Sequence, residues 1–209
     1  MISAFQKYSF VTAGFCNATE SASLEQPILM DQVHGVDTLI ITNSPSSVPQ
    51  CDALVSSTEG LKLTIKTADC APVLFLDPMA KVIAATHAGW KGAFQGILEN
   101  TVLTMLKLGA TLPNIHTAIG PHLTKENFQV SVEMKNLFPT TEHRFFISSA
   151  AGIYFDFTAY LVHRLERAGI HQIDLFPIDT FADSTYNSYR RDKTNPARQY
   201  SFIQLNKGV

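Results

Sequence analysis

Residues 61–109 read LKLTIKTADCAPVLFLDPMAKVIAATHAGWKGAFQGILENTVLTMLKLG, and this segment is the most informative about the fold. Residues 61–67 alternate apolar and polar side chains with the period of a half-buried strand, and Lys62, Thr64 and Lys66 form the polar face. Residues 73–76 and 82–86 are apolar on both faces, which is typical of strands covered on both sides. We therefore expect three consecutive strands, the first half-buried and the next two buried.

The same segment ends in a predicted helix. Beyond the turn at residues 89–92, apolar side chains recur at helical spacing and trace one face, formed by Phe94, Ile97, Leu98, Val102, Met105 and Leu106. Gly109 is the residue type that most often follows a helix end. A second helix is predicted over residues 157–168, with Asp156 as its N-cap, and a shorter one over residues 130–137.

The remaining strand candidates are scattered along the chain, at residues 36–42, 53–56, 115–119 and 173–176. Strands and helices are mixed, but they do not follow strict βαβ alternation. We therefore predict an α/β or α+β fold, with residues 1–209 forming a single layered domain in which mixed β-sheets are flanked by helices.

Composition narrows the class of protein. The chain has 209 residues, of which 45% are hydrophobic and 16% charged, enough to bury a full core. The net charge is −2, so neither nucleic acid nor a membrane is an expected partner, and no apolar run approaches the roughly 18 residues of a membrane span. An obligate protein partner is not evident either.

Cysteine usage points to a cellular compartment. The three cysteines, Cys16, Cys51 and Cys70, are odd in number and form no CxxC pair, which argues against a disulfide framework. Free thiols suit a reducing cytosol, and the N-terminal residues do not read as a signal peptide. We expect a cytoplasmic protein.

Three turns at strand ends carry side chains that can bind a metal. Residues 31–35 (DQVHG) contain His34, residues 67–72 (TADCAP) contain Cys70, and residues 87–92 (HAGWKG) contain His87. Two imidazoles and a thiolate are a plausible zinc ligand set, and three protein ligands leave a position open, as in catalytic rather than structural sites. Such a centre activates water for attack on an electrophilic carbon.

The third turn also suits an anion. Gly89 and Gly92 stand at a predicted helix N-terminus, where free backbone N–H groups favour negative charge, and Lys91 adds a positive charge. Plainer interpretations remain open on these residues alone. A histidine in a turn is often a hydrogen-bonded structural residue, and a cysteine between apolar strands is usually part of the core. His122, beside Gly120 and Pro121, is the one further histidine that we keep as a candidate pocket residue.

These three turns stand in the order of motifs known from one family. QVHG at 32–35, ADCAP at 68–72 and HAGWKG at 87–92 are joined by CDALV at 51–55, IGP at 119–121, FQV at 128–130, FDF at 155–157 and SYRRD at 188–192. Together they resemble the laccase-domain family, also called the multicopper polyphenol oxidase or polyphenol oxidoreductase family. Its bacterial members include a peptidoglycan editing factor. One departure is Asp179-Thr180, where members often have Cys-Thr.

The resemblance implies a function. It implies zinc bound by His34, Cys70 and His87, and phosphorolysis of adenosine, inosine, guanosine and methylthioadenosine, with deamination of adenosine as a second activity. The expected partners are therefore purine nucleosides and phosphate. Asp69 is expected to orient a ligand or relay a proton, and the expected substrate and phosphate contacts are Gln32, Gly89, Lys91, Gly92, Arg190 and Arg191.

Other functions stay open at this stage. A copper oxidase of phenols is less favoured, because a multicopper site needs clustered histidines and the sequence has no HxH pair. A metal-free cysteine hydrolase acting in peptidoglycan precursor editing would use Cys70 as nucleophile and His87 or His34 as base. A non-catalytic nucleotide-binding module would use the same pocket without turnover.

Overall fold

A six-stranded mixed sheet forms the centre of the computed structural model, which describes residues 2–208. Its strand order is β12-β8-β6-β7-β4-β3, with parallel pairs at the two edges and antiparallel pairs between them. The strands are β3 (Thr38–Ile40), β4 (Ala53–Ser56), β6 (Ala71–Asp77), β7 (Val82–Ala88), β8 (His116–Ile119) and β12 (Gln172–Leu175). All six fall within or next to the predicted strand segments.

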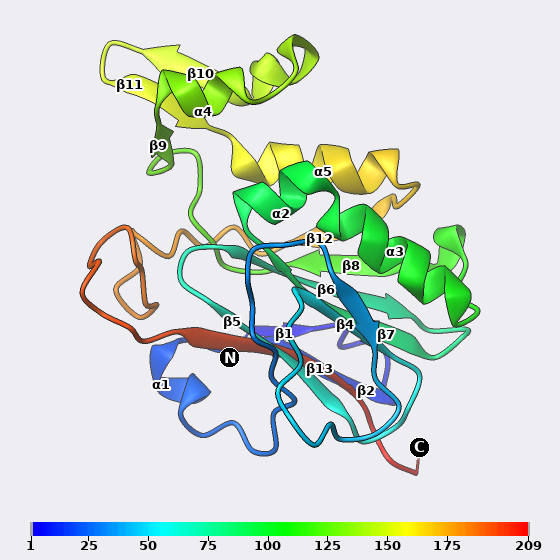
Figure 1. Ribbon diagram of the computed structural model, residues 1–209. Helices are drawn as coiled ribbons and strands as arrows, with labels where there is room; N and C mark the ends of the chain where they lie inside the picture. Colours follow the sequence, from blue (N-terminus) through cyan, green and yellow to red (C-terminus); the bar gives the residue numbers. More distant parts are fainter. Residues whose placement is uncertain (1, 209) are drawn as a thin grey trace.

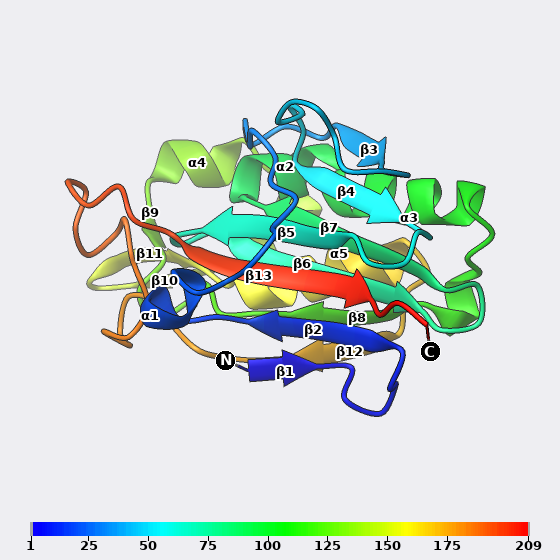
Figure 2. The same ribbon diagram turned by 90° about the horizontal axis from the view of Figure 1, so that it is seen from below.

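A second sheet packs against one face of the first. It is antiparallel, in the order β1-β2-β13-β5. Figure 2 views the molecule from the face on which this second sheet lies. Its strands are β1 (Ile2–Ala4), β2 (Val11–Phe15), β5 (Lys62–Thr67) and β13 (Gln199–Leu205). The two ends of the chain therefore meet in one sheet, because β13 pairs with β2 on one side and β5 on the other.

Helices cover the opposite face of the six-stranded sheet (Figure 1). They are α2 (Trp90–Gln95), α3 (Ile97–Lys107) and α5 (Phe157–Arg167). The side chains of β6 alternate between the two layers, with Val73 and Phe75 in the core under the helices and Leu74 and Leu76 in the core between the sheets. This double cover explains why the strand is apolar on both faces, as the sequence predicts.

Two expectations need correction in detail. The single helix expected after residue 92 is two helices, because Gly96 takes a left-handed conformation (φ 109°) and the Arg164 guanidinium donates to the freed carbonyl of Phe94 at 2.8 Å. Thr64 is buried although we expected it on a polar face, because the segment at Ile28 lies against β5 and accepts a hydrogen bond from the Thr64 amide.

A small third sheet projects beside the helices. It has the order β10-β11-β9, from β9 (Gln129–Val130), β10 (Phe146–Ser149) and β11 (Gly152–Phe155), and it carries α4 (Val132–Asn136). The helix predicted over residues 130–137 is therefore shorter, beginning after the Ser131 N-cap because residue 130 belongs to a strand. The remaining short helices are α1 (Ala18–Ser21), η1 (Leu112–Asn114) and η2 (Thr140–Phe145).

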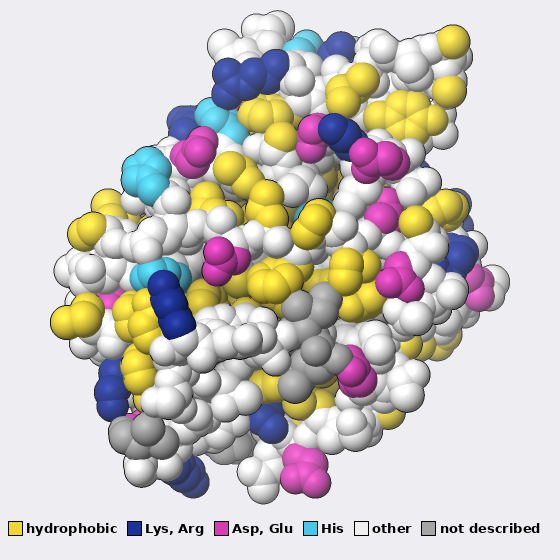
Figure 3. Space-filling model, turned by 180° about the vertical axis from the view of Figure 1, so that it is seen from behind, with side chains coloured by type: hydrophobic (Ala, Val, Ile, Leu, Met, Phe, Trp, Pro, Cys, Tyr) yellow, Lys and Arg dark blue, Asp and Glu magenta, His cyan; other side chains and the backbone are white. Residues whose placement is uncertain are grey.

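The surface mixes charges of both signs. On the face shown in Figure 3, basic and acidic side chains are interspersed among hydrophobic ones, so their fields partly cancel. Among residues 2–208, no helix combines the length and the apolar character that crossing a bilayer requires. The expectation that residues 1–209 form one domain stays a prediction, as does the cytoplasmic location.

Candidate active site

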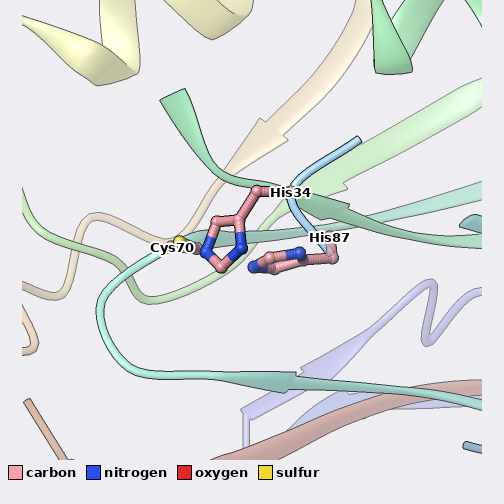
Figure 4. A group of neighbouring side chains, drawn as sticks. All are labelled: His34, Cys70 and His87. Carbon is pink, nitrogen blue, oxygen red and sulfur yellow. The ribbon is translucent and has the colours of Figure 1, made fainter. Parts of the chain in front are cut away.

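The three predicted metal ligands meet at one end of the six-stranded sheet. Cys70 directly precedes β6, and His87 lies near the end of β7. The antiparallel register pairs Pro72 with His87, which brings these two ligands together. His34 reaches them from the segment before β3, and Figure 4 shows the three side chains gathered around one point. Their ligand atoms all lie within 4.8 Å of one another.

A buried carboxylate, Asp52, supports both histidines. Asp52 precedes β4, is 0% exposed, and holds its Oδ1 2.7 Å from Nδ1 of His87. The same carboxylate accepts hydrogen bonds from the backbone amides of Val33, His34 and Gly35, at 3.3, 3.0 and 2.7 Å. The sequence motifs do not assign Asp52 a role, and only its contacts show that it touches both ligand segments.

Close contacts explain why glycine occupies positions 89 and 92 of the HAGWKG turn. A Cβ atom on Gly89 would lie 2.8 Å from Cδ2 of His34 and 3.2 Å from Sγ of Cys70, so glycine is what lets the turn pass behind the ligands. A Cβ on Gly92 would lie 2.7 Å from the carbonyl oxygen of Gly35. The turn is therefore packed against both other ligand segments, in addition to any role in anion binding.

The site lowers the pKa of the Cys70 thiol and raises the pKa of the buried His87 imidazole. Burial alone would raise the pKa of Cys70, but the charge of His87 and hydrogen bonds from both imidazoles lower it to about 6. Burial alone would lower the pKa of His87, but the Cys70 thiolate and the Asp52 carboxylate raise it to about 9. Between these values the metal-free site holds a thiolate and an imidazolium.

A cleft of about 790 Å³ opens over the ligands. Basic side chains of Lys66, Lys91, Arg190 and Arg198 line it, together with aromatic rings of Trp90, Phe128, Phe157 and Tyr189. The acidic groups in its lining are Asp31 and Asp69. A second cleft, of about 820 Å³, runs along α5 and contains none of the predicted site residues. The cleft over the ligands combines flat apolar surface with positive charge.

Two predicted residues hold the cleft's walls together. The side-chain amide of Gln32 donates to the carbonyl of Lys66 at 2.7 Å and accepts from its amide at 2.9 Å, as a strand would. Asp69 accepts from the hydroxyl of Thr180 and from the backbone amide of Arg190, both at 2.7 Å. Both side chains line the cleft, and both act as braces between segments that are distant in sequence.

The predicted cationic residues divide into two groups. Lys91 and Arg190 line the cleft, with Lys91 Nζ 5.7 Å from the ring centre of Trp90. Arg191 is not in its lining, and its guanidinium donates instead to backbone carbonyls of its own loop, those of Thr180 and Phe181 at 2.9 and 2.8 Å. The role of Arg191 in phosphate binding stays a prediction that this placement does not favour.

His122 is placed in the interior. It is 1% exposed, with Nδ1 2.8 Å from the carbonyl of Gly120 and Nε2 2.8 Å from the hydroxyl of Thr158. Both ring nitrogens have partners, and the residue is not in the lining of either cleft. Asp179 likewise braces a loop, accepting from Thr124 and Asn127.

Sequence reasoning missed several residues besides Asp52. Lys66 belongs to the polar face of the alternating stretch at 61–67, and its position at the end of β5 beside Cys70 was a usable signal. Arg198, Phe128 and Tyr189 come from segments that reach the cleft only through the fold. Phe128 and Tyr189 stand in the FQV and SYRRD motifs, which gave them no role, and the local pattern around Arg198 does not distinguish it from other surface residues.

The donor set suits a transition metal. Two imidazole nitrogens and a thiolate sulfur within 4.8 Å match the preferences of zinc and of copper better than those of magnesium or calcium. Because Gly89 has no side chain, no Cβ atom at this position crowds the His34 ring or the Cys70 sulfur. A carboxylate behind His87 is the common outer partner of a metal-bound imidazole.

Comparison with known proteins agrees with the motifs. A family model described as multi-copper polyphenol oxidoreductase laccase matches residues 10–206. This chain belongs to that family. Among curated relatives within it, purine nucleoside phosphorylase YfiH of Escherichia coli (strain K12) is 36% identical, over 86% of this chain and 74% of its own length. A purine nucleoside phosphorylase of Streptomyces coelicolor is 35% identical, over 80% of this chain and 70% of its own length.

Solved structures share the fold over most of their length. The hypothetical protein YfiH of Bacillus licheniformis superposes with a TM-score of 0.84 at 24% identity, covering 94% of this chain and 93% of that one. YlmD of Geobacillus stearothermophilus gives 0.84 at 21% identity, covering 97% and 94%. These likenesses establish the mixed-sheet architecture.

Proposed function

We propose that this chain is a zinc-dependent purine nucleoside phosphorylase acting on adenosine, inosine, guanosine and methylthioadenosine, and that it also deaminates adenosine. The observation that carries the proposal is the meeting of a His–Cys–His ligand set with basic and aromatic side chains in one cleft. The names of the curated relatives, purine nucleoside phosphorylases at 35–36% identity, support it.

In this proposal His34, Cys70 and His87 hold the zinc. The ion would supply Lewis-acid activation of an oxygen nucleophile or of the leaving group. A copper polyphenol oxidase is less well supported despite the family description, because among the described residues a single three-residue ligand cluster is found. Multicopper chemistry requires several histidine clusters.

Phosphorolysis needs a phosphate held beside the ribose. A phosphate oxygen bonds to C1′ while the bond from C1′ to the purine N9 breaks, and the departing base takes the electron pair and then a proton. Lys91 and Arg190, which line the cleft, would neutralise the phosphate, whereas Gly89 and Gly92 are buried outside its lining and stay predicted contacts through their backbone amides. Arg190 has its guanidinium 5.7 Å from the ring centre of Phe128, so charge and flat surface are adjacent.

The purine itself needs flat apolar surface. The rings of Trp90, Phe128 and Tyr189 line the cleft and can stack on a base. Gln32 and Asp69 have other tasks in this scheme, because their polar groups are already bonded to Lys66, Thr180 and Arg190. We assign Asp69 the orienting role, since it fixes the backbone of Arg190 beside the Cys70 turn.

The test is to follow adenosine with the zinc-loaded protein, with and without phosphate, by chromatography. Adenine that forms only with phosphate reports phosphorolysis, inosine that forms without phosphate reports deamination, and hypoxanthine reports both in sequence. Both activities should disappear in His34→Ala and Cys70→Ala, and they should persist in His171→Ala, which removes an exposed histidine outside the cleft.

Absence of turnover, or turnover that survives loss of His34 and Cys70, would overturn the proposal. Tight nucleoside binding without turnover would instead indicate a non-catalytic binding module. The same purified samples therefore distinguish an enzyme from a non-catalytic binding protein.

A metal-free cysteine hydrolase is the second candidate, favoured by one observation. Cys70, with a pKa of about 6, His87, with a pKa of about 9, and Asp52 line up as thiolate, imidazolium and carboxylate. Such an enzyme could act in peptidoglycan precursor editing. Activity on an amide or ester that survives removal of metal by a chelator, and is lost on alkylation of Cys70, would favour it over the phosphorylase.

A further inference from the structure

The Asp52 carboxylate contacts both histidine segments of the ligand cluster. Its Oδ1 lies 2.7 Å from Nδ1 of His87 and accepts from the His34 amide at 3.0 Å, while its Oδ2 accepts from the Gly35 and Val33 amides at 2.7 and 3.3 Å. Asp52 is 0% exposed, so water does not share these contacts. Each carboxylate oxygen faces backbone donors, Oδ1 the His34 amide and Oδ2 the Val33 and Gly35 amides, so both oxygens are acceptors.

For His87 this contact decides the tautomer. A carboxylate can only accept, so Nδ1 of His87 must carry the hydrogen. Nε2 is then the nitrogen left to face Cys70 and His34, and it has its lone pair available when the ring is neutral. If the ring turned over, Asp52 would lose the imidazole donor and keep only its three amide donors, so the observed orientation is favoured.

For His34 the same carboxylate shapes the backbone. His34 has a φ of 61°, a left-handed conformation that is sterically unfavourable for a residue with a Cβ atom. Three successive amides at Val33, His34 and Gly35 converge on Asp52 and offset that cost. The side chain of His34 is exposed, so its position depends on its backbone more than on packing around the ring.

We propose that Asp52 is a positioning residue that sets both histidine ligands at once, through the tautomer of His87 and the backbone of His34. The inference rests on the proposed zinc site, and it adds a residue whose loss weakens zinc binding without removing a ligand. Outer-sphere partners of metal-bound histidines typically contribute 10- to 100-fold in affinity.

The chain offers a matched control in Asp77. This aspartate is also 0% exposed and also accepts three backbone amides, those of Met79, Ala80 and Thr111, at 2.9, 2.9 and 2.8 Å. It ends β6, whereas Cys70 precedes the start of that strand, so about 20 Å of strand separates the two positions. Its contacts include no ligand segment.

The experiment measures Zn²⁺ affinity of metal-free Asp52→Asn and Asp77→Asn by competition with a chelating dye. Asparagine keeps the volume but has one acceptor oxygen, so it cannot serve His87 and the amides together. We expect the zinc dissociation constant to rise about 10- to 100-fold in Asp52→Asn and to stay within about twofold in Asp77→Asn. Circular dichroism establishes that each variant is folded.

A second measurement uses the unmodified protein, so the inference can be tested even where Asp52→Asn does not fold. In zinc-loaded wild-type protein, nitrogen-15 spectra of the imidazoles should show His87 with hydrogen on Nδ1 and without hydrogen on Nε2. The opposite tautomer would overturn the inference. So would an Asp52→Asn protein that is folded and binds zinc as tightly as wild type.

These outcomes are distinct from failure of the proposed function. A wild-type protein that does not bind Zn²⁺ refutes the zinc site itself. A wild-type protein that binds zinc, beside an Asp52→Asn variant that binds it equally well, refutes the role of Asp52 and leaves the phosphorylase proposal standing.

Discussion

The two ends of the β6–β7 hairpin use the same device for different purposes. At the turn end, Asp77 accepts three backbone amides and closes the connection to β7. At the other end, Asp52 also accepts three backbone amides, but its fourth contact is the imidazole of His87. Both carboxylates are fully buried, so burial does not distinguish them.

The two carboxylates differ in their partners, because one of the groups that Asp52 contacts is a side chain. At the turn end, Asp77 accepts hydrogen bonds from backbone amides, so it stabilises the fold. The other end directs one contact to a side chain that can bind metal, and it lies under a cleft of about 790 Å³. A buried carboxylate becomes part of a functional site when its partner is itself chemically reactive.

The largest expected effect is loss of a ligand. Cys70→Ala should abolish stoichiometric zinc and reduce phosphorolysis by more than about 100-fold, the upper end of what an outer-sphere change costs. Asp77→Asn should destabilise the fold by about 1–3 kcal/mol and leave zinc content unchanged. Elemental analysis and thermal unfolding measure the two effects, and a Cys70→Ala protein with full zinc would contradict the assignment of the reactive end.

The next effect is on thiol chemistry in the metal-free protein. The pKa of Cys70 is lowered to about 6, whereas burial raises that of Cys51 to about 12 and also raises that of Cys16. Iodoacetamide should therefore label Cys70 selectively, with a midpoint near pH 6, and bound zinc should protect it. Peptide mass mapping across pH measures this, and a midpoint above pH 8 would show that the ion pair does not form.

The same pair predicts how stability of the metal-free protein depends on pH. The pKa of Cys70 is lowered on folding, so its contribution is lost as pH falls through about 6. The pKa of His87 is raised on folding, so its contribution is lost as pH rises through about 9. Between about 6.5 and 9 these two contributions change in opposite directions and largely cancel, so the unfolding midpoint of wild type should vary little across this range. In Cys70→Ala the Asp52 carboxylate still raises the pKa of His87 and no thiolate offsets it, so the unfolding midpoint should fall as pH rises across the same range, which thermal unfolding at several pH values measures.

A smaller effect tests the packing at Gly89. In Gly89→Ala the added methyl group meets His34 and Cys70, so we expect zinc affinity to fall about tenfold. Gly109→Ala is the control, because a Cβ there meets nothing within 4 Å and its φ of 94° gives a backbone cost alone, about 1 kcal/mol. Equal zinc affinity in the two variants would argue against a steric role for Gly89.

The smallest expected effect concerns the rim of the cleft. Lys91 is exposed, so replacing its charge in Lys91→Met should raise KM for phosphate about two- to fivefold, in line with the energies of exposed ionic contacts, and change kcat little. Lys107→Met, at the end of α3 and outside the cleft, should leave both constants unchanged. Steady-state kinetics with varied phosphate decide whether the turn binds phosphate.

Much of the central sheet could be predicted from sequence, and less of its partner sheet. The runs in β6 and β7 are apolar on both faces, so their strands and their burial follow from pattern alone. Strands β1, β2 and β13 were not predicted. Strand β13 pairs with β2 from the other end of the chain, and no local pattern records such a pairing. The break at Gly96 was not predicted. The donor that satisfies the freed Phe94 carbonyl there, Arg164, comes from another helix.

The sequence by itself determined the family and predicted the three candidate ligands, because the motifs around His34, Cys70 and His87 keep their order along the chain. Only the tertiary structure decided how the site is supported. It placed Asp52 behind both histidines, set Gly89 against Cys70, and separated Arg190 from Arg191. The physical reason is that a ligand's identity belongs to one residue, whereas its tautomer, backbone and charge depend on neighbours that the chain brings together only by folding.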